Sequence, residues 1–163
     1  MARSLTERMM GAATLDLTVY EEVEHDETAT GQAAAVVVIV AACQAVGAWG
    51  LGPMRILGAG LTQLLGWLVW AGVTYFIGTR LFRGTATWGE LLRTLGFAQA
   101  PGVLALLAII PLLGWLILPV VAIWMLVAGV VGIRQALDFS TGKAVFTALL
   151  GWLVIWVARA ILL

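Results

Sequence analysis

The residues of this sequence best suited to chemistry stand together in the stretch YEEVEHDE, residues 20–27. On a helix, Glu21 and His25 lie one turn apart, and so do Glu22 and Asp26. A carboxylate and an imidazole at that spacing can hold a divalent cation. Acidic runs just before an apolar segment are more often a solvated face, however. We therefore predict no metal site here and assign Glu21, Glu22 and Asp26 to a candidate interaction face.

A second polar stretch, TWGELLRTLGFAQAP at residues 87–101, interrupts the apolar part of the chain. Thr87 and Glu90 have the T-x-x-E spacing of a capping box, which predicts a helix that begins there. Glu90 and Arg93 are expected at the mouth of this helix, where water and lipid headgroups solvate them, and they join the candidate interaction face. Gln99 lies deeper and is expected to bond to another helix, with solute binding as the alternative; its candidate partners are Gln63, Thr62 and Gln44.

Catalytic chemistry finds little support in the sequence. Only Ser4 and Ser140 could serve as nucleophilic serines, no acidic residue lies within an apolar span, and the single histidine, His25, lies outside the spans. A phosphate-binding G-x-x-x-x-G-K-[ST] motif is absent. Cys43 is the single cysteine, so the sequence offers no intrachain disulfide and no cysteine metal cluster. We predict a protein that is not an enzyme and that binds no cofactor.

The apolar segments that must position these residues set the fold class. A mean hydropathy of +1.03 and several apolar runs exceed what a soluble core can bury in a chain of 163 residues. We predict an all-α fold, a polytopic membrane helical bundle in which residues 30–163 form one domain. Its five transmembrane helices are expected at about 30–49, 56–79, 90–110, 113–136 and 143–162.

Residues 1–29 are expected to form a cytoplasmic segment with an amphipathic helix at the membrane interface. Its apolar residues recur at helical spacing, at Met9, Met10, Ala13, Leu17 and Tyr20. We expect one ordered helix over residues 5–27. This segment is rich in acids, and the loops after the second and fourth spans contain basic residues. We therefore expect the segment to fold back over these two loops by charge attraction.

The basic residues predict the orientation in the membrane. Five spans place seven of the nine Lys and Arg on one side, namely Arg3, Arg8, Arg80, Arg83, Arg93, Arg134 and Lys143. Arg55 and Arg159 remain for the other side. This asymmetry predicts a cytoplasmic N-terminus and an external C-terminus in the inner (plasma) membrane. Arg80, Arg83 and Arg134 complete the candidate interaction face, which is therefore cytoplasmic.

Small residues at a spacing of four predict close contacts between the spans. Gly96 and Ala100 form one such pair, and Ala128 and Gly132 form another. Pro101 is expected to bend the third span, because proline lacks the amide hydrogen that a helix needs. These residues are assigned to helix packing together with Gln99.

The runs GTATWGELLRTLGFAQAPGVLALLAIIPLLG and VVGIRQALDFSTGKAV resemble the bacterial branch of the Yip-one domain family. The resemblance is most specific at three motifs. These are Gly-Phe-Ala-Gln-Ala-Pro, which ends at Pro101, the pair Ile110 and Pro111, and Arg-Gln-Ala-Leu-Asp, which begins at Arg134. It implies five spans and a cytoplasmic N-terminus. The eukaryotic relatives, which interact with Ypt/Rab GTPases, have a long cytoplasmic segment with an Asp-Leu-Tyr-Gly-Pro signature. This chain lacks both features, so Rab binding is not expected.

These observations lead to two hypotheses about function. The first is a non-enzymatic membrane scaffold or accessory subunit that binds a cytoplasmic factor or a larger membrane complex. The second is a protein for permeation of a small solute or a lipid, since glycine and proline within spans also suit transporters. The expected partners are the lipid bilayer and either other membrane subunits or a cytoplasmic protein, with no nucleic acid.

Overall fold

A computed structural model describes residues 3–47, 53–110 and 112–162 of the chain, without the side chains of 53–57, 59, 155, 156 and 158–162. The described residues form helices and no strand. In chain order these are α1 (Leu5–Ala13), α2 (Leu17–His25), α3 (Ala29–Gly47), α4 (Pro53–Phe76), the π-helix η2 (Ile77–Leu81), α5 (Trp88–Phe97), the 3-10 helix η3 (Ala100–Ile109), α6 (Leu113–Ala136) and α7 (Thr141–Leu162). The side chains of Arg55 and Arg159, used above for orientation, lie outside this description.

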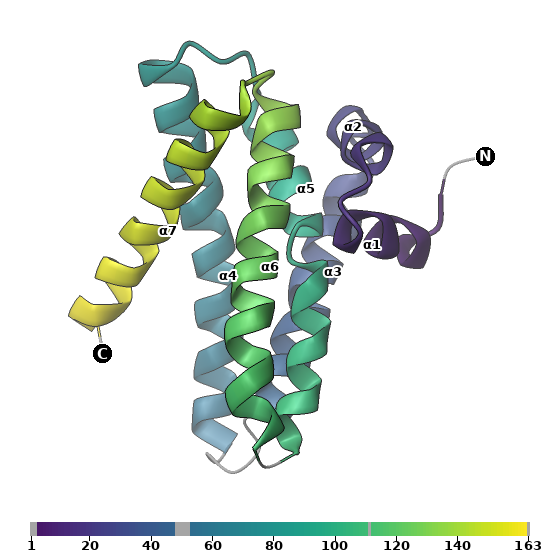
Figure 1. Ribbon diagram of the computed structural model, residues 1–163, viewed down its shortest axis with the longest axis vertical. Helices are drawn as coiled ribbons and strands as arrows, with labels where there is room; N and C mark the ends of the chain where they lie inside the picture. Colours follow the sequence, from purple (N-terminus) through teal and green to yellow (C-terminus); the bar gives the residue numbers. More distant parts are fainter. Residues whose placement is uncertain (1–2, 48–52, 111, 163) are drawn as a thin grey trace.

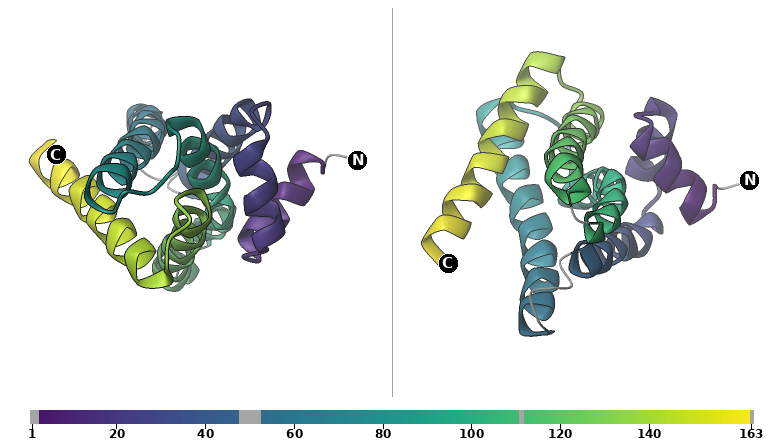
Figure 2. Two further views of the ribbon diagram at one scale, coloured as in Figure 1. Left: turned by 90° about the horizontal axis from the view of Figure 1, so that it is seen from above. Right: turned by 60° about the horizontal axis from the view of Figure 1, so that its bottom comes forward.

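Four long helical segments run side by side with alternating direction: α3, α4, α5 continued by η3, and α6 (Figure 1). The last helix, α7, crosses α4 and α6 obliquely, whereas α1 and α2 pack on the opposite side of the bundle (Figures 1 and 2). This arrangement confirms the predicted all-helical membrane bundle.

The helices of the bundle match most of the predicted spans. Four are long and apolar enough to cross a membrane, at Ala29–Gly47, Gly60–Leu81, Trp88–Ile109 and Leu113–Ala136. The apolar stretch Thr141–Val154 of α7 is shorter. A fifth crossing therefore remains a prediction.

The third span is divided in two near Pro101. The α-helical part ends at Phe97, and Pro101 lies in the first turn of the 3-10 helix that follows. Because proline has no amide hydrogen and its ring clashes with the preceding turn, α-helical bonding cannot continue through this position. The 3-10 helix restarts with a hydrogen bond of 2.7 Å from the Gly102 amide to the Gln99 carbonyl. The predicted bend is thus a break between two helices.

The N-terminal segment forms two short helices, so the single helix expected over residues 5–27 is wrong. A turn at Leu15, whose φ is 63°, separates them, and Asp16 then caps α2 by accepting from the Thr18 amide. A capping box of Ser4 and Glu7 begins α1. A side chain such as Asp16 competes with the helix for backbone hydrogen bonds, which explains the interruption.

The apolar face expected to contact lipid is also divided. Tyr20 is buried inside the protein, where its hydroxyl donates to the Ala12 carbonyl at 3.0 Å. Met10 and Leu17, by contrast, are 65% and 42% exposed. Helices α1 and α2 therefore pack part of their apolar surface on the bundle, and the rest of that surface is exposed.

Small residues lie where the helices of the bundle approach one another closely. A Cβ atom added at Gly96 would lie 2.8 Å from the Ala33 Cβ and 3.2 Å from its carbonyl oxygen, so α5 and α3 are in close contact there. At Gly132, an added Cβ would lie 3.3 Å from Thr94 on α5 and 3.3 Å from the Tyr20 ring on α2. The other residues assigned to packing are all buried: Gln99, Ala100, Pro101 and Ala128.

Candidate functional site

The charged residues gather at one end of the bundle, where α3, α5 and α7 begin and where η2 and α6 end. We call this the charged end and define it by Arg80, Arg83, Glu90, Arg134, Asp138 and Lys143. Arg80, Arg83 and Arg134 are exposed there, and so is Glu21 on α2. Glu90 is half-buried because it closes the predicted capping box, accepting from the Thr87 amide at 2.9 Å.

Two other acids of the candidate interaction face, Glu22 and Asp26, are engaged inside the N-terminal segment. Arg8 on α1 is 1% exposed and donates to both of them, with Nη2 at 2.8 Å from the Glu22 carboxylate and 2.6 Å from the Asp26 carboxylate. Its Nη1 also donates to the Gln32 amide oxygen on α3 at 2.9 Å. The guanidinium therefore joins α1, α2 and α3, and a partner cannot reach these acids freely.

These contacts shift the pKa values of the two acids in the same direction. Burial alone would raise the pKa of Glu22, but hydrogen bonds from Arg8 and Arg3 outweigh it and lower the pKa. The pKa of Asp26 is lowered by hydrogen bonds from Thr28 and from Arg8. Both shifts favour the ionised carboxylates in the folded protein.

Arg93 lies buried, which corrects the expectation that water and headgroups solvate it. Its side chain is 6% exposed and points into the last turn of α2. The guanidinium donates to the carbonyl of Val23 at 2.9 Å and to that of Glu24 through Nε at 3.2 Å and also through Nη2, and it reaches the Thr30 hydroxyl at 3.4 Å. Positive charge on the final carbonyls of a helix stabilises its C-terminus, so Arg93 fixes α2 to α5.

Docking of the N-terminal segment therefore differs from the expected attraction to the cytoplasmic loops. Among the described residues, each ion pair joins Arg3 or Arg8 to an acid of the same segment, and none reaches Arg80, Arg83 or Arg134. Instead, Trp124 on α6 donates its indole hydrogen to the Ala13 carbonyl at 2.8 Å. Hydrogen bonds to α5 and α6, together with packing, hold the segment against the bundle.

Glu24 marks where α2 meets the charged end. Burial raises the pKa of its carboxyl, and the nearby charges of Glu90 and Asp138 raise it further, against the lowering effect of His25. These two acids belong to α5 and to the turn after α6. Because Arg93 on α5 also donates to the Glu24 carbonyl, the last turn of α2 lies beside the charged end, and its exposed Glu21 belongs to an ordered element there.

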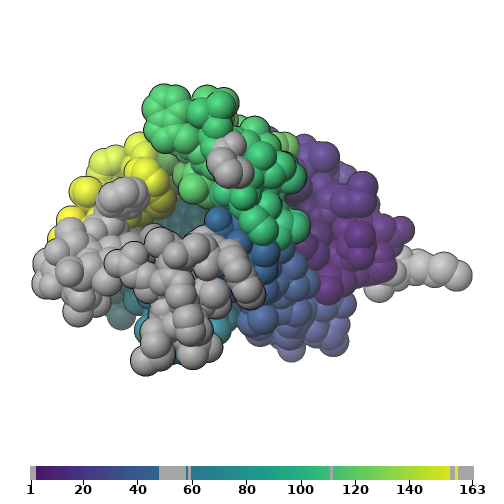
Figure 3. Space-filling view, turned by 90° about the horizontal axis from the view of Figure 1, so that it is seen from below, coloured from purple at the N-terminus to yellow at the C-terminus, as the bar shows by residue number. Residues whose placement is uncertain are grey.

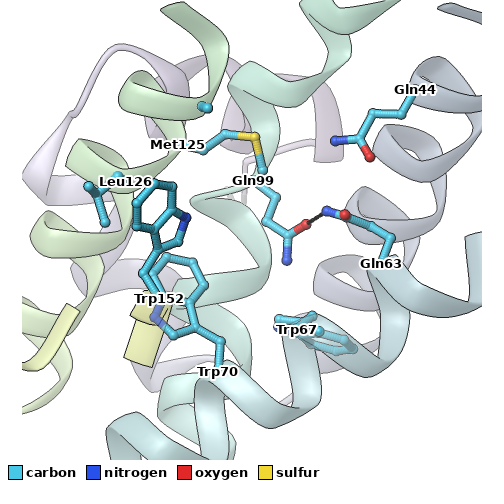
Figure 4. A pocket seen from close by; sticks show the side chains of 10 residues that line it. Gln44, Gln63, Trp67, Trp70, Gln99, Met125, Leu126 and Trp152 are labelled. Carbon is cyan, nitrogen blue, oxygen red and sulfur yellow. Dashed lines mark hydrogen bonds between the residues drawn. The ribbon is translucent and has the colours of Figure 1, made fainter. Parts of the chain in front are cut away.

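A cavity of about 230 Å³ lies deeper in the bundle, between α3, α4, the α5–η3 junction, α6 and α7 (Figure 4). Gln99, which is 3% exposed, accepts a hydrogen bond there from Gln63 on α4. Of the three partners that the sequence leaves open for Gln99, Gln63 is the one that bonds to it. The other lining residues are Gln44, Gly66, Trp67, Trp70, Ala122, Met125, Leu126 and Trp152.

Sequence reasoning missed the roles of two residues, Trp70 in this region and Arg8 in the N-terminal segment. Trp70 fills the space between α4, α6 and α7, since Cβ atoms added at Gly129 and Gly151 would lie 2.2 Å and 2.6 Å from its ring. The other is Arg8, which the charge count treated as an ordinary cytoplasmic cation. A glycine opposite a tryptophan on another helix leaves no pattern in a single sequence, and neither does an arginine opposite acids of another helix. The partners of Trp70 and of Arg8 could therefore not be predicted.

The described residues form long apolar helices, with charges gathered at one end and a cavity that has no ionisable side chain among its described lining residues. These features are those of a polytopic helical membrane protein. The chain matches the family model of the Yip1 domain over residues 18–162. It belongs to the Yip1 domain family, as the sequence resemblance predicted. No curated protein and no solved structure among those compared with the chain matches it.

Proposed function

We propose that this protein is a non-enzymatic membrane scaffold or accessory subunit, which binds a cytoplasmic factor or a larger membrane complex through its charged end. The observation that carries the proposal is the buried Arg93, which fixes α2 beside the charged end. A surface that is ordered before binding loses less conformational entropy when a partner docks.

The charges on this surface suit recognition of a partner with charges of both signs. Arg80, Arg83 and Arg134 are exposed at the charged end, and Glu21 is exposed on the neighbouring α2. Complementary charges at an interface set its specificity and speed up its formation. The membrane-embedded helices then serve to hold this surface at the bilayer.

We place the charged end in the cytoplasm, in the inner (plasma) membrane, on the strength of the distribution of basic residues. Reporter fusions after Gly84 and after Gly142 test the orientation, and both should read cytoplasmic. A fusion after Leu163 should read external if α7 crosses the membrane. A cytoplasmic reading at Leu163 would contradict the fifth crossing.

Partner binding is tested by purifying the full-length chain from its native membrane in mild detergent and measuring the mass of the complex. We expect a mass beyond that of the chain and its detergent, with a second component of constant stoichiometry. The double charge reversal Arg80→Glu/Arg83→Glu should remove that component. Arg159→Glu, which reverses a charge predicted on the opposite side, is the matched control and should retain it. A wild-type preparation without a second component would contradict the scaffold.

The second candidate function is permeation of a small solute or a lipid. The cavity between the helices favours it, because transporters place their binding sites near the middle of the bilayer. Uptake into vesicles that contain the purified protein alone would support permeation. A scaffold predicts no flux above that of protein-free vesicles.

A further inference from the structure

The cavity described above has a chemistry that the scaffold role does not use. By the rise of a helix, about 1.5 Å per residue, Gln99 lies roughly 14 Å along its segment from Glu90 at the charged end, and Gln44 lies roughly 22 Å from the start of α3. The apolar core of a bilayer is about 30 Å thick, so both amides lie within it. Polar groups at this depth are costly unless they are hydrogen-bonded.

The amides of the cavity hold more hydrogen-bonding groups than they use. The Gln63–Gln99 bond occupies one amide hydrogen and one carbonyl, and whichever way the two amides are turned, three of their hydrogens remain. Gln44 makes no side-chain hydrogen bond to another described residue. The indole nitrogen of Trp70, which also lines the cavity, is buried and has no hydrogen-bond partner among the described residues. That nitrogen is covered by α7 at Gly151, so the unused donors that can reach a molecule in the cavity are those of the glutamine amides.

The other lining residues determine which shape and charge of ligand the cavity can accommodate. Trp67, Trp70 and Trp152 present three indole rings, whose faces favour flat rings. None of the described lining residues is ionisable, so nothing would offset the cost of burying a charged ligand. The volume of about 230 Å³ exceeds the roughly 150 Å³ that accommodates benzene in a protein core, which leaves room for substituents.

The cavity also opens onto the surface of the protein. Ala122 on α6 and Trp152 on α7 line it and are themselves exposed. In the space-filling view from below, the surface is hollowed between α6 in green, α7 in yellow and α3 in blue (Figure 3). A small molecule could therefore enter without unfolding of the bundle.

We propose that this cavity binds a flat, uncharged ring that carries carbonyl groups, of the size of a substituted benzoquinone, with the ring between the tryptophans and a carbonyl oxygen accepting from the glutamine amides. The glutamine amide hydrogens that lack a protein partner then bond to the ligand. The proposal does not depend on the scaffold role, because none of these residues belongs to the charged end.

The test measures binding of 2,3-dimethoxy-5-methyl-1,4-benzoquinone to the full-length protein in detergent by ligand-observed NMR. We expect saturable binding of the quinone, about tenfold weaker binding of p-xylene, which lacks carbonyl groups, and none of benzoate, which is charged. Gln44→Leu should weaken quinone binding about tenfold and leave the thermal midpoint unchanged or higher, because this amide has no side-chain partner to lose.

A matched pair of variants locates the site. Ala122→Phe places a ring in the cavity and should abolish quinone binding, whereas Val120→Phe enlarges an outward residue of the same helix and should leave it unchanged. The proposal is overturned if the quinone does not bind saturably or if p-xylene binds equally well. It is also overturned if quinone binding survives both Gln44→Leu and Ala122→Phe, since a site elsewhere or a cavity filled by water alone would give that result.

Discussion

Replacing Arg93 by methionine should release α2 from the bundle. Methionine keeps the apolar stem but removes the donors to the carbonyls of Val23 and Glu24 and to the Thr30 hydroxyl. A hydrogen bond from a charged donor contributes about 1.5–3 kcal/mol, and the freed carbonyls of α2 can recover part of this with water. We therefore expect the free energy of local opening of α2 to fall by about 3 kcal/mol, which corresponds to roughly hundredfold faster exchange.

Hydrogen exchange of the amides of α2 in detergent measures this effect. Arg93→Lys should give an intermediate rate, because an ammonium cannot match the planar fork of a guanidinium. Arg80→Met removes an exposed arginine of the charged end and is the control, with no expected change in α2. Equal exchange of α2 in wild type and Arg93→Met, or equal acceleration by Arg80→Met, would refute the role of Arg93.

Other predictions follow from the same contacts. Gly96→Ala should destabilise the protein by about 1–3 kcal/mol in thermal or denaturant unfolding, because the new methyl meets Ala33, whereas Gly31→Ala enters open space and should be neutral or stabilising. Arg8→Met should cost about 2–4 kcal/mol in the same assay, since it removes the cation that pairs with Asp26 and one of the two that pair with Glu22. Because the pKa of Asp26 is lowered in the fold, its stabilisation is present above its ordinary value of 3.8 and is lost as pH falls below it, so the protection factors of the α2 amides, taken relative to the intrinsic exchange rate at each pH, should fall on acidification. Exchange of α2 at neutral pH should change little with added salt, since the groups that hold α2 are largely buried.

The sequence determined much of the fold because its signals are local. The span predicted at 113–136 coincides with α6, and the capping box of Thr87 and Glu90 begins α5 as expected. Hydropathy and caps depend on neighbours within a few residues, which a single sequence contains. The same applies to Gly96, whose lack of a side chain allows a close contact whatever residue lies opposite.

The roles of the charged residues could not be predicted in the same way. Arg93 stands one turn after Glu90 at a helix mouth, which is typical of a solvated residue. Its burial depends on α2, which lies about seventy residues earlier in the chain. Likewise, Arg8 joins acids fourteen and eighteen residues away and a glutamine on α3. Such contacts are set by tertiary packing, which charge counting along the chain does not include.

Site-specific photocrosslinking in native membranes tests the central claim, that the charged end binds a partner, most directly. A photoreactive amino acid is placed at Glu21 on α2 and at Arg134 on α6, both exposed, and at Leu153, an exposed apolar residue of α7, as the control. The account predicts that Glu21 and Arg134 give an adduct with the same protein partner and that Leu153 does not. An adduct from Leu153 alone, or no protein adduct from either position at the charged end, would contradict it.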